Sequence, residues 1–156
     1  MKNPAEAFPG HDKISGEIAT LMGWFFLRYL GRIYREFDGD FVLVMVLGEI
    51  AHHNICHFFS LGKPRKNRQK PSDPISVDID SLQPCNAFSL SEATGIPRET
   101  IRRKIDLLLQ QELICKHPKG GYIIQPHLSE HFSTFNAQLL EDFLATSEDL
   151  KKLLTG

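Results

Sequence analysis

Three arginines near the start of a predicted helix are the residues whose type and spacing point most directly to chemistry. They are Arg98, Arg102 and Arg103, in the segment GIPRETIRRKID that begins at Gly95. Gly commonly follows the end of a helix and Pro suits the first turn of the next, so Gly95 and Pro97 predict a tight turn between two helices. A guanidinium can bind guanine O6 and N7, or a phosphate, through two hydrogen bonds. Taken alone, arginines on a helix are more simply explained as a solvated face.

Histidines spaced four residues apart indicate a second chemistry, metal binding. His53 and His57 have this spacing, with Cys56 beside them, and His127 and His131 repeat it near the C-terminus. Two such pairs brought together could hold zinc tetrahedrally. However, the chain has seven histidines and no HExxH motif, and chance readily produces this spacing in such a composition. We therefore predict that no metal site forms, and we keep a metal-sensing repressor as an alternative.

Catalytic signatures are missing from the sequence. It contains no Ser-His-Asp pattern and no Gly-rich phosphate loop. We therefore predict a protein that is not an enzyme and needs no cofactor. The three cysteines are an odd number without a CxxC pair. This pattern favours reduced thiols that pack as small apolar side chains.

Composition and charge indicate a globular protein with a basic centre. Apolar residues make up 42% of the 156 residues and charged residues 24%, which excludes wholesale disorder. The longest apolar run, Phe41 to Leu47, is too short to span a bilayer, and the N-terminal residues lack a signal-peptide core. We therefore expect a cytoplasmic protein without a membrane partner. Residues 62–122 carry 11 Lys or Arg against 7 Asp or Glu, whereas both flanking segments are acidic, and this asymmetry suggests where a polyanion docks.

Hydrophobic periodicity predicts the elements of the first half of the chain. Apolar residues recur at helical spacing over 14–37 and again over 41–59, and Asp40 is a plausible N-cap of the second helix. A proline-rich basic loop over 62–74 and a short alternating strand over 75–80 follow. The first helix carries two apolar stripes, so it must be covered by the fold or by a second subunit.

The elements that carry the arginines lie in the second half. A short helix capped by Ser89 or Ser91 should end at Thr94, and the next should run from Pro97 to about Gln111. That helix should face the core with Ile101, Ile105 and Leu108. The remaining predicted elements are a tight hairpin with strands over 113–118 and 122–126, its Lys119-Gly120-Gly121 turn, and one helix over 127–154.

Residues 89–124, SLSEATGIPRETIRRKIDLLLQQELICKHPKGGYII, closely resemble the winged helix-turn-helix of bacterial transcriptional regulators. The portion from Gly95 to Ile114 is similar to the recognition helix and the start of the wing in the MarR, IclR and GntR groups. The resemblance implies a mainly α fold with a small β-hairpin wing. It also implies one domain over 1–156, a winged-helix module over about 41–125, and flanking helices over about 14–37 and 127–154 that dimerise, as in MarR proteins. Two departures are a shorter wing without an Asp-x-Arg element and a long segment over 62–88.

The resemblance also implies a function, a sequence-specific DNA-binding transcriptional regulator that binds an inverted repeat of double-stranded DNA as a homodimer. In such motifs the second helix enters the major groove and the wing contacts the backbone or the minor groove. The candidate DNA-binding residues are Ser89, Ser91, Arg98, Glu99, Thr100, Arg102, Arg103, Lys116, His117, Lys119 and Tyr122. The alternative from another class is a winged helix used only for protein interaction. An acidic or apolar helix face would favour that reading, and Arg102 and Arg103 speak against it.

Four aromatic residues of the first helix are candidates to line a pocket for a small-molecule effector. They are Trp24, Phe25, Phe26 and Tyr29. Packing in the core or across a dimer is the simpler explanation for an aromatic stripe of this kind, and we favour it.

Overall fold

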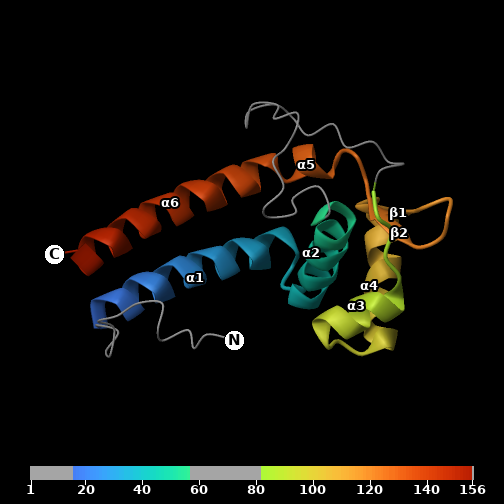
Figure 1. Ribbon diagram of the computed structural model, residues 1–156, viewed down its shortest axis with the longest axis horizontal. Coiled ribbons are helices and arrows are strands. Elements are labelled where there is room, and N and C mark those ends of the chain that lie inside the picture. The colour runs from blue at the N-terminus through green and yellow to red at the C-terminus, as the bar shows by residue number, and fades with distance from the viewer. Residues whose placement is uncertain (1–15, 57–81, 156) are drawn as a thin grey trace. The chain divides into compact units, whose positions relative to one another are not determined.

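The described part of the chain is mainly helical with one small β-hairpin. The computed structural model describes residues 16–56 and 82–155, which form six helices and two strands (Figure 1). They group into two compact units, one made of the segments up to Glu36 and from Ser133 onward, the other of the segment Phe37–Phe132. The expected class, mainly α with a small hairpin, is confirmed, and the single domain stays a prediction. No helix in the described residues is both long and apolar enough to cross a membrane.

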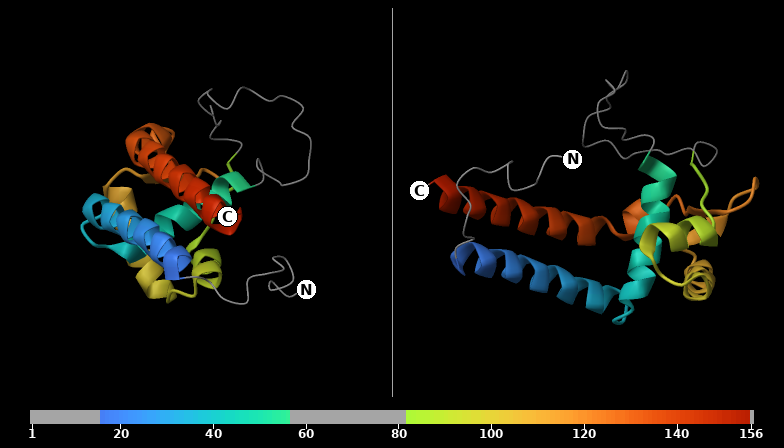
Figure 2. Two further views of the ribbon diagram at one scale, coloured as in Figure 1. Left: turned by 90° about the vertical axis from the view of Figure 1, so that its left-hand side faces the viewer. Right: turned by 60° about the horizontal axis from the view of Figure 1, so that its bottom comes forward.

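The first and last helices of the described chain pair to form one unit. Helix α1 (Gly16–Glu36) and helix α6 (Ser133–Thr155) lie side by side and run in opposite directions (Figures 1 and 2). The observed α1 confirms the helix predicted over 14–37 within the described residues. Among the described residues of this unit each helix packs only on the other, so many of their large apolar side chains are exposed.

Aromatic rings and one shared carboxylate hold α1 against α6. Phe25 meets Phe143 edge to face, with ring centroids 6.0 Å apart. Asp142 Oδ1 accepts a hydrogen bond from Arg28 at 2.5 Å, and Oδ2 lies 2.5 Å from Arg32 Nη1. Because one carboxylate on α6 pairs with two cations a helical turn apart on α1, it fixes the register of the two helices.

Helix α2 (Phe41–Ile55) is the centre of the second unit. It contacts α3 (Ala87–Thr94), α4 (Arg98–Gln110) and the hairpin. Asp40 caps α2 as predicted, because its Oδ1 accepts a hydrogen bond from Leu43 N–H at 2.9 Å. The helices bury their apolar sides against one another, and the fully covered side chains include Val46, Ile50, Leu90, Ile101, Ile105 and Leu108.

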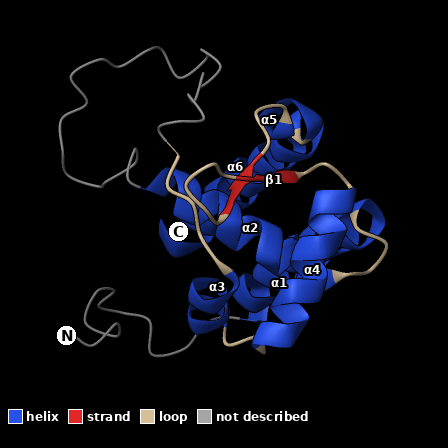
Figure 3. Ribbon diagram, turned by 90° about the vertical axis from the view of Figure 1, so that its right-hand side faces the viewer, coloured by secondary structure: helices blue, strands red, loops and turns tan. Residues whose placement is uncertain are grey.

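The hairpin consists of two short antiparallel strands, β1 (Ile114–Lys116) and β2 (Tyr122–Ile124) (Figure 3). Cys85 pairs with Tyr122 on the other edge of β2, through bonds of 3.2 Å and 2.8 Å, so a third segment joins the hairpin. The turn uses positive φ angles of 91° at Gly120 and 85° at Gly121, as the sequence predicted. A Cβ atom at Gly121 would lie 2.6 Å from the Cys85 carbonyl oxygen, so a larger residue does not fit there.

A fully buried asparagine ties the hairpin to the central helix. Asn54, near the end of α2, is 0% exposed. Its Nδ2 donates to the carbonyls of Gln83 at 2.7 Å and Tyr122 at 3.3 Å, and its Oδ1 accepts from Ile124 N–H at 2.9 Å. Buried polar groups are costly unless they are hydrogen-bonded, so this set of bonds specifies one position of β2 relative to α2.

The start of α3 and the start of α4 correct two sequence expectations. Asn86, and neither Ser89 nor Ser91, is the N-cap of α3. The Asn86 side chain accepts from the N–H groups of Phe88 and Ser89, and Ser89 Oγ accepts from Asn86 N–H in return. Because α3 begins at Ala87, the amides that need acceptors are those of Asn86, Phe88 and Ser89, and neither serine could cap a helix that begins before it. Pro97 is the N-cap of α4 instead of lying within its first turn.

The predicted single helix over 127–154 is wrong, because it is interrupted at Phe132. A short helix α5 (Leu128–His131) ends there, and α6 begins at the next residue. Leu128 is buried in the core of the 37–132 unit, and the Phe132 ring stacks on Phe37 at 5.6 Å. Ser133, a residue type common at helix starts, follows directly. The predicted loop, strand and helix end within residues 57–81 lie outside the described residues.

Candidate nucleic-acid interface

Side-chain hydrogen bonds fix the turn between α3 and α4. Gly95 ends α3, as the sequence predicted, and its φ of 70° lies in the left-handed region. Ser91 Oγ donates to the Ile96 carbonyl at 2.7 Å, and Ile96 N–H donates to Thr94 Oγ1 at 3.2 Å. The hydroxyl of Ser91, a candidate DNA-binding residue, is therefore used to hold the turn and to set the direction in which α4 begins.

Burial of one side of α4 leaves its arginines exposed. Ile101, Ile105 and Leu108 have 0%, 1% and 0% exposure, as their spacing predicted. Arg103 lies on the opposite side and Arg102 flanks that side, and both are exposed. Of the other α4 candidates, Arg98 and Glu99 are also exposed and Thr100 is half-buried.

The three arginines have different surroundings. The Arg98 guanidinium lies 6.0 Å from the centre of the Phe88 ring, a cation–π distance. Arg103 Nε lies 3.5 Å from Glu99 Oε1, an exposed pair one helical turn apart, which stabilises little but orients the side chain. Arg102 has no ion pair with any described residue. Of the three guanidinium groups, that of Arg102 is the one for which the described structure shows neither an ion pair nor a cation–π contact.

A pocket of about 330 Å³ lies where α4, the hairpin and the start of α3 meet, and we name it the Arg102 pocket. Arg102 lines it from α4 and Asn86 from the N-cap of α3. The hairpin residues that line it are Lys116, His117, Gly120, Gly121 and Tyr122. The fold thus brings three predicted site residues of the hairpin next to Arg102, although they are more than ten positions away in the sequence.

His117 differs from its predicted position on the exposed wing. Its side chain is 5% exposed, because it turns inward and its Nδ1 accepts a hydrogen bond from Lys119 N–H at 3.2 Å. Lys116 and Lys119 are exposed, as expected for phosphate contacts, and Tyr122 is half-buried. Ser89 is half-buried in the capping box. The exposed candidates on the hairpin are therefore its two lysines.

Two residues that determine the geometry of the Arg102 pocket and the hairpin were not identified from the sequence. Asn86 sets the start of α3 and lines the Arg102 pocket, and Asn54 fixes β2. The Asn86 signal was readable, because Asn is among the preferred N-cap residues and Ser89 follows three positions later. Asn54 carries no such local signal, since its partners lie 29 to 70 residues away.

An ion pair connects α4 to the start of α2. Lys104 Nζ lies 2.5 Å from Asp40 Oδ2, and Asp40 Oδ1 caps α2. Burial raises the pKa of the Asp40 carboxyl, but the hydrogen bonds from Lys104 and Leu43 N–H outweigh it, so the pKa lies below its ordinary value. The charge of Lys104 is thereby paired, and among the described residues at the Arg102 pocket and the hairpin turn the cations without an ion pair are Arg102, Lys116 and Lys119.

The residues considered for metal binding do not come together in the described chain. No group of three or more His, Cys, Asp or Glu side chains within residues 16–56 and 82–155 is arranged to hold a metal ion. His57 lies outside the described residues. Burial raises the pKa of the Cys85 thiol to about 11 and also raises that of Cys115. Both thiols are therefore protonated at neutral pH and are poor ligands and nucleophiles.

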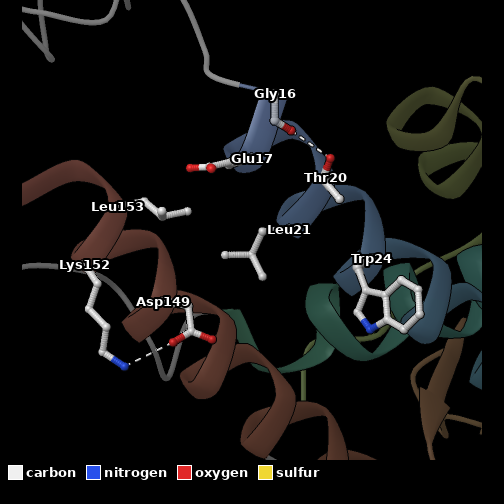
Figure 4. Close-up of a pocket in the computed structure, with 8 residues that line it drawn as sticks. All are labelled: Gly16, Glu17, Thr20, Leu21, Trp24, Asp149, Lys152 and Leu153. Atoms are coloured by element: carbon white, nitrogen blue, oxygen red, sulfur yellow. Dashed lines mark hydrogen bonds and ion pairs between the residues drawn. The ribbon is translucent and has the colours of Figure 1, made fainter. Parts of the chain in front are cut away.

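Three of the four aromatic residues considered for an effector pocket pack on one another, because the Phe25 ring centroid lies 5.6 Å from that of Phe26 and 6.5 Å from that of Tyr29. A groove of about 970 Å³ between the N-terminal part of α1 and the C-terminal part of α6 is lined by Trp24 but not by the other three (Figure 4). Leu21 and Leu153 point into the space between the helices (Figure 4). Tyr29 packs instead on Phe135, with ring centroids 6.4 Å apart. The groove is mostly apolar and widely open.

Comparisons with known protein families, with characterised proteins and with solved structures found no match for this chain. Function is therefore inferred from the chemistry of the described residues.

Proposed function

We propose that the protein is a winged-helix DNA-binding transcriptional regulator in which α4 reads the major groove and the β1–β2 hairpin is the wing. The order of elements supports this: α2, the Cys85 segment, α3, a tight turn, α4 and the hairpin follow one another as the resemblance implied. The observation that carries the proposal is that the exposed side of α4 presents Arg102 and Arg103 in its first two turns, beside the exposed Lys116.

Charge and geometry of this face suit a duplex. Arginine is the side chain best matched to guanine O6 and N7, and residues near the start of the reading helix reach base edges. Lys116 and Lys119 are exposed on the hairpin, where lysines neutralise backbone phosphates. Buried Ile101 and Ile105 hold α4 rigidly from behind, so its arginines are presented at fixed positions.

We further propose that the protein acts as a homodimer through α1 and α6. Both helices expose large apolar side chains, among them Trp24 at 63% and Leu27 at 70% exposure on α1, and Leu140, Phe143 and Leu144 at 55–57% on α6. Large apolar side chains exposed in such number on two paired helices are typical of an interaction site. Two helix pairs packed face to face would form a four-helix bundle and cover it. A symmetric dimer presents two reading helices, so the operator is expected to be an inverted repeat with half-sites about one helical turn apart.

Selection of bound fragments from random-sequence DNA tests the proposal and reads the site at the same time. The expected result is an enriched inverted repeat. If Arg102 or Arg103 is bidentate to guanine, its change to Ala should weaken binding by about 1–3 kcal/mol per half-site and relax the preference at one base pair. An Arg102→Ala, Arg103→Ala double variant that folds normally and binds the selected DNA as tightly as the parent would show that α4 is not the reading helix.

A protein-interaction module is the second candidate. Phe88 on α3 is 58% exposed and Leu107 on α4 is 38% exposed, so the 37–132 unit also offers apolar side chains to a partner. Selection that enriches no DNA sequence, together with weak and salt-sensitive binding to all sequences alike, would favour this candidate.

A further inference from the structure

A buried hydrogen-bond donor without an acceptor lies at the Arg102 pocket. His117 lines the pocket, and its Nε2 atom is buried and has no hydrogen-bond partner among the described residues. Since Lys119 N–H donates to Nδ1, that nitrogen carries no proton, and the neutral ring carries its proton on Nε2. A buried N–H that has lost water without gaining an acceptor is unfavourable, so an acceptor brought to it by a ligand recovers that loss.

The surroundings of this donor are positively charged. Arg102 and Lys116 line the same pocket from α4 and from β1, and none of the described residues that line it is acidic. Arg102 also lacks an ion-pair partner in the described chain. Asn86, the N-cap of α3, stands at the pocket as well, so the positive end of the α3 dipole faces it.

We propose that the Arg102 pocket binds one phosphate group, with Arg102 and Lys116 as its cationic partners and His117 Nε2–H as a neutral donor. A phosphate offers several acceptor oxygens in a tetrahedral arrangement, so it can meet donors that approach from a helix, a strand and a turn together. A backbone phosphate of duplex DNA and a phosphate carried by a small molecule share this chemistry. The first source rests on the proposed function, and it adds an anchoring contact to the base-reading role of α4.

Under this proposal the turn of the hairpin has to move before a phosphate can reach His117 Nε2. Nε2 is covered, so a phosphate oxygen reaches it when the segment from His117 to Gly121 opens slightly. Two residues of that segment, Gly120 and Gly121, carry no side chain to obstruct such a movement. The Gly121 carbonyl accepts from His117 N–H at 3.0 Å, which keeps the histidine attached to the turn as it opens.

Titration with inorganic phosphate tests the pocket without DNA. The imidazole ¹⁵N resonances of the full-length chain are followed while phosphate replaces chloride at constant ionic strength. We expect a saturable shift of His117 Nε2 at millimolar phosphate. His52 and His53, which do not line the pocket, serve as internal controls.

Two substitutions at His117 separate its two nitrogens. His117→Asn retains an acceptor near the Nδ1 position for Lys119 N–H and removes the Nε2 donor, whereas His117→Gln does the reverse. Phosphate binding, followed in these variants by the Arg102 side-chain resonance, should weaken about tenfold in His117→Asn, as expected for loss of a bond to a charged group. It should survive in folded His117→Gln. Arg102→Gln should abolish the saturable shift, and Arg35→Gln, which removes an exposed cation of α1, should not change it.

A DNA arm distinguishes the two sources of phosphate. With duplexes of unrelated sequence, His117→Asn should weaken binding about tenfold to all of them while leaving the salt slope unchanged, because no charge is removed. Arg102→Gln should reduce that slope by about 0.9. Loss of phosphate binding without loss of DNA affinity assigns the pocket to a small phosphate-bearing ligand. The phosphate site is refuted, even if the protein binds DNA, by two results together. Phosphate causes no shift at His117, and His117→Asn binds DNA as tightly as the parent. If the chain binds phosphate but no DNA, the proposed function is refuted and the proposed phosphate site is retained.

Discussion

Replacing Asn54 by alanine tests whether the buried amide holds the hairpin on the central helix. The side chain makes three hydrogen bonds, and it is 0% exposed. In Asn54→Ala the N–H of Ile124 loses its acceptor inside the fold, which costs about 1–3 kcal/mol. The carbonyl of Tyr122 keeps the bond from Cys85 N–H, and exposed Gln83 can exchange its lost bond for water, so those two acceptors add little.

The cavity left by shortening the side chain adds to this loss. We expect Asn54→Ala to lower the free energy of unfolding of the 37–132 unit by about 2–4 kcal/mol in total. The measurements are urea unfolding by circular dichroism and amide hydrogen exchange at Ile105 and Leu108, which report on the core of this unit. The matched control is Asn136→Ala, an exposed asparagine of α6, which should change the free energy of unfolding by less than about 0.5 kcal/mol. A loss below 1 kcal/mol at an unchanged m-value would refute the reasoning.

Three further predictions follow from other features. The pKa of the Asp40 carboxyl is lowered in the folded protein, so the ion pair with Lys104 contributes its full stability above the ordinary carboxyl pKa of about 3.9 and loses it as the pH falls through the lowered pKa. In Asp40→Asn, which still caps α2, the free energy of unfolding should therefore decrease less between neutral and acidic pH than it does in the parent. An equal decrease in the two proteins contradicts this prediction. Zinc should not bind stoichiometrically or raise the thermal midpoint, and a tight one-per-chain site lost in His53→Ala would prove this wrong. Sedimentation at micromolar concentration should give a mass of about twice 17.7 kDa. Leu27→Glu, which places a charge on the exposed surface of α1, should give a monomer with unchanged helix content. A parent protein that sediments as a monomer would refute the proposed dimer.

Much of the fold could be predicted from local chemistry. The α4 core face was readable because Ile101, Ile105 and Leu108 recur at helical spacing, and the end of α3 was readable because Gly commonly follows the last residue of a helix. The Asp40 cap was predicted for the same reason, since a short acceptor side chain before an apolar run favours a helix start. Each of these features depends on residues within one or two turns of one another.

What the sequence did not predict depends on contacts between distant segments. The break at Phe132 arises because Leu128 and Phe132 belong to the core of the 37–132 unit, whereas the apolar periodicity continues through them into α6. His117 was expected at the surface because hairpin turns are usually exposed, and the bond from Lys119 N–H that holds it inward has no sequence signature. The proximity of Arg102 to Lys116, His117 and Tyr122 could not be predicted, because it depends on the register of β1 and β2, which the sequence does not give.

The pairing of α1 with α6 has a consequence for synthesis of the chain. The two helices are separated by the whole 37–132 unit, so α1 leaves the ribosome about a hundred residues before its partner. Domains fold largely as they emerge, so the middle unit can close while α1 still presents Trp24 and Leu27 to the surrounding solution. A chain that stops before Ser133 retains the segment of the middle unit but lacks α6, and with it half of the surface that we propose for dimerisation, so under that proposal subunits assemble only after α6 has been synthesised.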